Sequence, residues 1–270
     1  MKSGNWLWRT LGATTLACLC ALLVGFGWAL RDTWFPQDGL VIPEAPAQES
    51  TGGAWADKSE LFVTTLGDSL TNGVGDATGQ GYAKRVTERL GDRLNKPVTL
   101  VNNLAVNGAR APQLLAGLDQ TGYRHAIAKS DLILFTIGGN DLFQIAQDGG
   151  SIAEGGDISV EQLEERLPEV TPKLEEVFKK LRELNGNARI VYVGLYNPFF
   201  DLPEMRSGSA VVAAWNAAAY ALAAADGNAT VVPTYDLFET HVKRYLSQDH
   251  FHPNAEGYDR IAERIVQALD

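Results

Sequence analysis

Apolar and polar positions divide the chain into three stretches with different patterns. Residues 11–30 form one apolar run without a charge. Residues 31–58 are interrupted by prolines and glycines and build no apolar face. From about residue 59 onward, short β-branched runs alternate with amphipathic stretches. We therefore predict a short N-terminus over 1–10, an apolar helix over 11–30, a flexible linker over 31–58 and one folded domain over 59–270.

Within the folded domain, the pattern predicts alternating strands and helices. The predicted strands are 60–66, 98–103, 131–137, 189–195 and 229–233. The predicted helices are 81–94, 110–129, 159–185, 207–225 and 254–269. Such alternation is typical of an α/β fold whose parallel sheet is covered by helices on both faces. The alanine-rich residues 210–225 are interpreted as one of these packed helices and not as a membrane span, because Asn216 and Tyr220 interrupt them.

The apolar run at 11–30 has the length of a membrane span. Twenty residues of helix match the roughly 30 Å thickness of the hydrocarbon core. Lys2 and Arg9 precede the run, and tryptophans flank it on both sides, as at a membrane interface. We therefore predict a single-pass anchor in a bacterial cell membrane, with residues 1–10 in the cytoplasm and the folded domain outside.

Two other interpretations of this segment stay open. It is a cleaved signal peptide of a secreted protein if processing occurs at Ala29 or after Ala45-Pro46-Ala47, although the second site lies far beyond the apolar run. It is a lipoprotein signal if Cys18 is the attachment site. Both cysteines, Cys18 and Cys20, lie inside the apolar run, so the exported part has no disulfide.

The net charge of the chain is −10, and almost all of it falls in residues 59–270. No basic stripe offsets it. A phosphate backbone would be repelled by such a domain, so nucleic acid is excluded as a partner.

Two short motifs at opposite ends of the domain supply complementary chemistry. Gly67-Asp68-Ser69-Leu70 follows the first predicted strand, which places a serine at the carboxyl edge of the sheet. Asp249-His250-Phe251-His252-Pro253 precedes the last helix and contains a carboxylate and an imidazole three residues apart. A serine hydroxyl becomes a nucleophile when a histidine takes its proton and a carboxylate orients that histidine. We therefore predict a catalytic triad of Ser69, His252 and Asp249, with His250 outside it.

Acyl transfer also needs hydrogen-bond donors for the oxyanion. Gly108 follows the second strand and can offer a backbone N–H, and Asn140 follows the third and can offer its side-chain amide. With the backbone N–H of Ser69 these make a predicted oxyanion hole of three donors. Asp68 and Asp141 are expected to hold the two loops by accepting hydrogen bonds from backbone N–H groups.

These four blocks together resemble the SGNH, or GDSL, family of esterases and lipases over roughly residues 60–267. The extended first block, which runs from Ser69 to Asp76, is most similar to membrane-anchored or secreted lysophospholipase-like bacterial members. The resemblance implies a flavodoxin-like three-layer α/β/α sandwich with a five-stranded parallel sheet. It also implies hydrolysis of carboxylic esters or thioesters without a metal or another cofactor. The Gly-x-Ser-x-Gly motif of α/β-hydrolases is absent from the sequence.

The natural substrate is not defined by these motifs. Lipid or short-chain acyl esters are our first hypothesis, with a lysophospholipase- or esterase-like activity. Deacetylation of a cell-envelope polysaccharide is the alternative, and a binding module without turnover is a third. Residues 143–158 are glycine-rich and form either a flap or a plain connection. The apolar side chains of residues 197–203 are expected to be exposed, and this loop either lines an acyl groove or simply connects two elements. The catalytic domain is expected to be a monomer.

Overall fold

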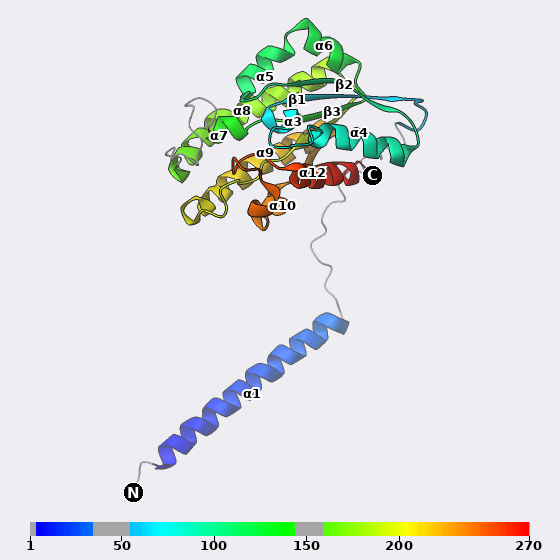
Figure 1. Ribbon diagram of the computed structural model, residues 1–270. Coiled ribbons are helices and arrows are strands. Elements are labelled where there is room, and N and C mark those ends of the chain that lie inside the picture. Colours follow the sequence, from blue (N-terminus) through cyan, green and yellow to red (C-terminus); the bar gives the residue numbers. More distant parts are fainter. Residues whose placement is uncertain (1–3, 35–54, 144–158, 270) are drawn as a thin grey trace. The chain divides into compact units, whose positions relative to one another are not determined.

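The computed structural model describes residues 4–34, 55–143 and 159–269 (Figure 1). Helix α1 (Gly4–Trp34) belongs to a unit of its own, Met1–Ala47, and exceeds the predicted apolar helix at both ends. Its central stretch Trp8–Trp28 is long and apolar enough to cross a membrane, and its side chains are exposed. An exposed apolar helix near the N-terminus is consistent with either a signal peptide or an anchor.

Most of the predicted linker, residues 35–54, lies outside the described residues, and so does the candidate cleavage site at 45–47. Residues 55–58, by contrast, belong to the second unit, Gln48–Asp270. Trp55 is buried in its core, and the Lys96 ammonium donates to the carbonyl oxygens of Trp55 (2.9 Å) and Lys58 (2.7 Å). The packed part of the domain therefore starts at least four residues before the predicted boundary. The Trp55 side chain occupies a place in the core, and the linker-like composition of residues 31–58 does not predict this.

The five predicted strands form one parallel sheet in the order β2-β1-β3-β4-β5. They are β1 (Leu61–Gly67), β2 (Val98–Ala105), β3 (Leu132–Thr136), β4 (Arg189–Val193) and β5 (Ala229–Val232). Strand β1 pairs with β2 on one side and β3 on the other, so the strand order reverses at β1. Open α/β sheets bind ligands at such a switch point, at the carboxyl ends of the strands.

Helices cover both faces of the sheet, which confirms the three-layer arrangement (Figure 1). On one face lie α4 (Gly81–Leu94) and α12 (Ala255–Gln267), which pack against Leu132 and Leu134 of β3. On the other lie α5 (Ala111–Leu118), α6 (Thr121–Ala128), α8 (Val160–Leu184) and α9 (Ser209–Asp226), which pack against Ile133 and Phe135. Alternate residues of one buried strand thus serve two cores, as expected for a parallel sheet. Shorter elements connect the layers: α3 (Ser69–Asn72), α7 (Gly139–Phe143), η2 (Pro203–Gly208), α10 (Tyr235–Glu239) and α11 (Val242–Tyr245).

The predicted helix 110–129 is wrong as a single element, because the structure has two helices, α5 and α6. Helix α5 ends at the cap residue Asp119, and Gln120 is extended (ψ 142°) before α6 begins. The break lets the ring of Tyr123 pack over Gly117. A Cβ atom on residue 117 would lie 3.1 Å from that ring. The Tyr123 hydroxyl then donates to the Leu104 carbonyl at 2.9 Å. This contact is tertiary, so periodicity along the chain does not reveal it.

Helix α9 contains the alanine-rich residues and packs in the domain as predicted. Trp215, Ala219 and Ala223 are buried against the sheet. The stretch Pro203–Asp226 is also long and apolar enough to cross a membrane, but a buried core helix meets the same criterion.

Candidate active site

Strand β1 ends at Gly67, which places the first motif at the switch point of the sheet. Gly67 has φ 126°, and a Cβ atom there would lie 1.9 Å from the Thr136 carbonyl oxygen of neighbouring β3. Only glycine therefore fits between the two strands. The close approach turns the chain sharply into α3 and leaves Ser69 at the carboxyl edge of β1.

Ser69 is the first residue of α3, and Asp68 caps this helix. The Asp68 carboxylate accepts from the Leu70 N–H at 3.0 Å and from the Thr136 hydroxyl at 2.6 Å. The cap is independent of the Ser69 side chain, so the hydroxyl of Ser69 is free for other partners. The predicted role of Asp68 as a holder of this loop is confirmed by these bonds.

The loop after α11 brings the second motif to the same place. The ring atom Nε2 of His252 lies 2.7 Å from Ser69 Oγ, and Nδ1 lies 2.6 Å from Asp249 Oδ2. Ser69 and His252 are 183 positions apart in the chain. The structure therefore joins all three residues of the predicted triad in one line of hydrogen bonds, with the connectivity that nucleophilic catalysis needs.

Asp249 is fixed by more than its histidine partner. Its Oδ1 atom accepts from Ser247 Oγ (2.6 Å) and from the backbone N–H groups of Phe251 (3.0 Å) and His252 (2.9 Å). Partial burial would raise the pKa of Asp249, but these bonds and the one to the His252 ring outweigh it and lower the pKa to about 2. Asp249 is therefore ionised at neutral pH and can hold the imidazole in one orientation.

The predicted oxyanion donors come from two loops beside Ser69. The amide of Asn140, in the first turn of α7, donates one N–H to the Ala109 carbonyl at 3.0 Å and has a second N–H to offer. This bond holds Asn140 next to the loop that carries Gly108. The same loop is joined to α3 by a 2.8 Å bond from the Asn72 amide to Asn107 Oδ1. Gly108, Asn140 and Ser69 thus lie on elements that hydrogen bonds connect directly.

Asp141 follows Asn140 and holds the same region from the other side. Its two oxygens accept from the Ala111 N–H at 3.0 and 3.2 Å, so its predicted structural role is confirmed. Burial is the main cause that raises the pKa of Asp141 from 3.8 to about 6, and these bonds and the charge of Arg110 oppose the rise. Burial also raises the pKa of Asp68, against the bonds from Thr136 and Leu70.

Asp141 makes stability depend on pH in a defined direction. The native state keeps the Asp141 proton up to a pH of about 6, whereas the unfolded chain loses it near 3.8, so stability falls as the pH rises through this window. In Asp141→Asn the amide oxygen of the new side chain can still accept from the Ala111 N–H, but nothing titrates there. Relative to Asp141→Asn, the wild type should lose up to about 3 kcal/mol of unfolding free energy between roughly pH 4 and 7. Urea unfolding at several pH values measures this difference, and parallel pH profiles for the two proteins would contradict it.

Three aromatic rings beside His252 form a cluster that the sequence did not predict. Phe143, Phe199 and Phe251 have centroid distances of 5.5, 6.2 and 6.1 Å, and the Phe251 ring lies 5.0 Å from the His252 ring. Phe143 and Phe199 are buried, whereas Phe251 is half-buried. The spacing of these residues along the chain gives no periodic signal, because the three come from segments far apart in the sequence.

The structure describes one of the two predicted substrate loops in full and the other only at its first residue. Residues 144–158 of the predicted flap lie outside the described residues. In the loop 197–203, the prediction that the apolar side chains are exposed is wrong for Pro198 and Phe199, which are buried. Asn197 closes this loop internally, with bonds to Met205 O, Ser209 Oγ and Phe199 N. These bonds fold the loop back on itself, and the Phe199 ring packs against Phe143 and Phe251.

The remaining histidines lie on the surface. His250 is exposed and has a left-handed backbone (φ 53°) that forms the turn between Asp249 and Phe251. His125 on α6 and His241 before α11 are also exposed. Sequence reasoning missed Ser247, the hydroxyl partner of Asp249, although its position two residues before the carboxylate is a recurrent local hydrogen-bond spacing.

Two bacterial proteins are similar in sequence to this chain over most of its length. The chain is 35% identical over 215 residues to the uncharacterized protein YpmR of Bacillus subtilis, covering 78% of this chain and 82% of that protein. It is 30% identical over 217 residues to the spore germination lipase LipC of Bacillus licheniformis, covering 77% of this chain and 96% of that protein.

Solved structures share the fold. The lipase Lip_vut3 from a goat rumen metagenome superposes with a TM-score of 0.66 at 28% identity, over 77% of this chain and 97% of that one. An acetylxylan esterase from Geobacillus stearothermophilus has a TM-score of 0.55 at 18% identity, over 77% and 94% of the two chains, and shows likeness of fold alone.

The family model that matches covers residues 65–260, which include the serine motif, both loops of the predicted oxyanion hole and the aspartate–histidine pair. Since this match spans most of the folded domain and agrees with the relatives, the chain belongs to the GDSL-like lipase/acylhydrolase family and is an enzyme of the esterase class.

Proposed function

We propose that the protein hydrolyses carboxylic esters through an acyl-enzyme on Ser69, with His252 as base and Asp249 as its orienting carboxylate. The observation that carries the proposal is the continuous line of bonds from Asp249 Oδ2 through the His252 ring to Ser69 Oγ, at 2.6 and 2.7 Å. A hydroxyl in this position can lose its proton to the imidazole as it attacks a carbonyl carbon.

In the first step, the Ser69 oxygen bonds to the carbonyl carbon while its proton passes to His252 Nε2. The charge that develops on the carbonyl oxygen is held by the N–H groups of Ser69 and Gly108 and by the Asn140 amide. The C–O bond to the alcohol breaks as His252 returns the proton to the leaving oxygen. Water then repeats the sequence on the acyl-enzyme, which releases the acid and restores Ser69.

An acyl ester of a lipid is the substrate class with the most support. Two relatives at 28–30% identity are named lipases. The half-buried Phe251 ring places an apolar surface directly beside the base, backed by Phe143 and Phe199. An acyl or alkyl chain gains about 0.8 kcal/mol for each methylene that such a surface removes from water.

The N-terminal helix is proposed to anchor the enzyme to the bacterial cell membrane, with the catalytic domain on the outer side. The unburied span Trp8–Trp28, basic residues before it and flanking tryptophans support this orientation. An enzyme held there meets lipid esters at the membrane surface.

One experiment addresses substrate and anchor together. Membranes carrying the full-length protein are washed with carbonate, and hydrolysis is measured on p-nitrophenyl esters of increasing chain length, on lysophospholipids and on acetylated polysaccharide. We expect the activity to remain in the washed membranes and to favour acyl chains longer than acetyl. Faster release of acetate from the polysaccharide would indicate the deacetylase, and activity released into the medium would indicate a cleaved signal peptide. A folded protein inactive on all of them would be a binding module.

A further inference from the structure

The loop at residues 73–81 follows the helix that carries the proposed nucleophile and packs against the proposed base. The loop begins directly after α3, and the Val74 N–H donates to the Ser69 carbonyl at 3.0 Å. Its two ends are in contact, because a Cβ atom on Gly73 would lie 3.1 Å from the Gly81 Cα atom. The loop is therefore closed at its base between α3 and α4. Its first residues, 73–76, are the end of the extended first block, to which the mechanism gives no role.

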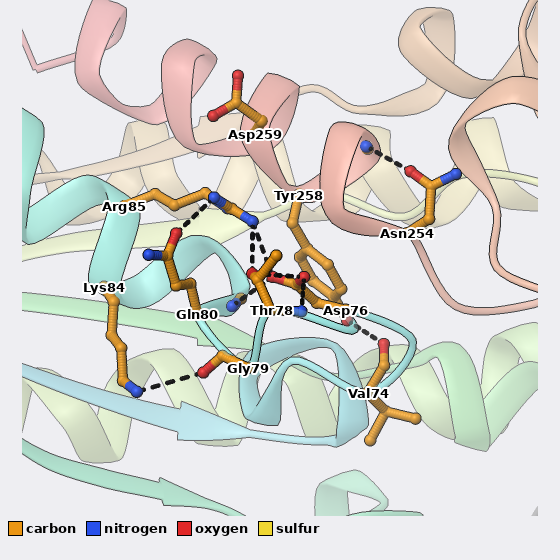
Figure 2. A network of polar contacts seen from close by, with 12 residues as sticks. Val74, Asp76, Thr78, Gly79, Gln80, Lys84, Arg85, Asn254, Tyr258 and Asp259 are labelled. Carbon is orange, nitrogen blue, oxygen red and sulfur yellow. Dashed lines mark hydrogen bonds and ion pairs between the residues drawn. The ribbon is translucent and has the colours of Figure 1, made fainter.

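Gly75 brings this loop against the histidine. A Cβ atom on Gly75 would lie 2.5 Å from the Pro253 carbonyl oxygen and 3.0 Å from both His252 Cβ and Ser247 Oγ. The backbone of Gly75 is thus packed against His252 itself and against the hydroxyl that holds Asp249. The next contact is the Tyr258 hydroxyl of α12, which donates to the Val74 carbonyl at 2.7 Å (Figure 2). Any shift of residues 74–75 is therefore passed to His252 by direct contact.

A single buried carboxylate fixes the loop. Asp76 accepts at Oδ1 from the Thr78 N–H (2.9 Å) and hydroxyl (2.7 Å), and at Oδ2 from the Gly81 N–H (2.9 Å) and Arg85 Nη2 (2.9 Å). Figure 2 shows Arg85 reaching from α4 to Asp76 while its other nitrogen donates to Gln80 at 2.6 Å. The Asp76 side chain is wholly buried and that of Arg85 is 12% exposed. Four donors on one carboxylate leave little freedom to the residues beside it.

The charge state of Asp76 agrees with this role. Burial would raise the pKa of Asp76, but the bonds from Thr78 and Gly81 and the charge of Arg85 outweigh it and lower the pKa. Asp76 is therefore ionised in the folded protein at neutral pH. Because Arg85 belongs to α4 in the sheet-covering layer, the ion pair ties the loop to the rigid part of the domain.

We propose that residues 73–81 set the position of His252 relative to Ser69, and that the Asp76–Arg85 pair is the positioning element that holds this loop in place. The inference rests on the proposed function, because it assigns the loop a role in that reaction. Misplacement of reacting groups by about 1 Å can cost on the order of 10²-fold in rate. The pair would thus act on the rate without touching the substrate.

The test is Asp76→Asn in the full-length protein. The amide keeps only one acceptor oxygen, so its NH2 group faces either the Thr78 N–H or the Gly81 N–H and Arg85. In either orientation at least one of the four bonds is lost, and so is the ion pair with Arg85. We expect kcat on a soluble ester, and the rate constant for labelling of Ser69 by a fluorophosphonate, to fall at least about tenfold, while KM changes less than about twofold. Labelling at the end point should remain complete, because the fold persists. A purely structural role would lower the end point and leave the rate constant of the folded fraction unchanged, and that result would overturn the proposal.

Asp259→Asn is the matched control. Arg89 lies one turn along α4 from Arg85 and pairs with Asp259 of α12 at 2.6 Å, so this change breaks another α4 ion pair without touching the loop. It should leave kcat and labelling as in the wild type.

If Asp76→Asn does not fold, Thr78→Val decides instead, because it removes one of the four donors isosterically. It should slow labelling, whereas Thr78→Ser, which keeps the hydroxyl, should restore the wild-type rate; equal rates for the two would refute the proposal.

A readout without turnover separates this inference from the proposed function. The NMR signal of the His252 ring proton bonded to Asp249 should shift in Asp76→Asn and not in Asp259→Asn, with His252→Ala used to assign it. A wild-type protein that neither hydrolyses esters nor labels at Ser69 would defeat the proposed function, and the ring signal would still report whether the loop positions His252. An unchanged ring signal together with unchanged labelling would overturn the inference alone.

Discussion

Ser69→Ala should abolish ester hydrolysis and leave the domain folded. The Ser69 hydroxyl is the group that the His252 ring contacts at 2.7 Å. Alanine lacks this hydroxyl, and its methyl group cannot attack a carbonyl carbon. Loss of a serine nucleophile costs on the order of 10⁶-fold in kcat in a well-studied serine protease, so the residual rate should be close to background. The fold should persist because the cap of α3 is made by Asp68 and Leu70, and alanine fits the buried site of Ser69. Ester turnover and thermal unfolding of the two proteins check both parts.

Ser130→Ala is the control for the loss of a buried serine hydroxyl. Ser130 is also buried, and its hydroxyl oxygen lies 2.7 Å from the Thr64 hydroxyl and 2.8 Å from the Ala126 carbonyl oxygen, next to the amino end of β3. Its removal should lower the unfolding free energy by about 1 kcal/mol and leave kcat unchanged. Wild-type turnover by a folded Ser69→Ala protein would place the nucleophile elsewhere.

The sequence predicted the frame of this site because the information lies in short segments. Strand β1 and Gly67-Asp68-Ser69 are contiguous, and Asp249 and His252 are three positions apart, so a local pattern suffices to relate them. The parallel sheet then follows from the alternation of strands and helices, and it carries Ser69, Gly108 and Asn140 to one edge.

What the sequence did not reveal depends on contacts between distant segments. The break between α5 and α6 is stabilised by Tyr123 against Gly117 and Leu104. Phe199 is buried because it contacts Phe143 and Phe251, which belong to segments far from it in the sequence. Each of these depends on side-chain packing in three dimensions, and the local pattern of the segment is compatible with another outcome.

Asn140→Ala should lower kcat by about 10²- to 10³-fold with little change in KM, as expected for the loss of one oxyanion donor. One N–H of the Asn140 amide is bonded to the Ala109 carbonyl, which fixes the plane of the amide and leaves the second N–H for the substrate oxygen. A donor that meets charge only as the tetrahedral intermediate forms stabilises that state more than the bound ester. Steady-state kinetics on a soluble ester measure the effect, and a rise in KM at constant kcat would instead indicate ground-state binding.

The same variant also removes a tether from the loop that carries Gly108, so this effect must be separated from donor loss. Asn72→Ala provides the separation, because it breaks the exposed 2.8 Å bond to Asn107 on the same loop and removes no group assigned to the oxyanion. We expect Asn72→Ala to reduce kcat only slightly, since exposed hydrogen bonds contribute little and the Asn140–Ala109 bond still holds the loop. If the two variants lose kcat equally, Asn140 acts by holding the loop and the oxyanion role passes to the backbone N–H groups of Ser69 and Gly108. A large loss in Asn140→Ala beside a small one in Asn72→Ala assigns the donor to the Asn140 amide.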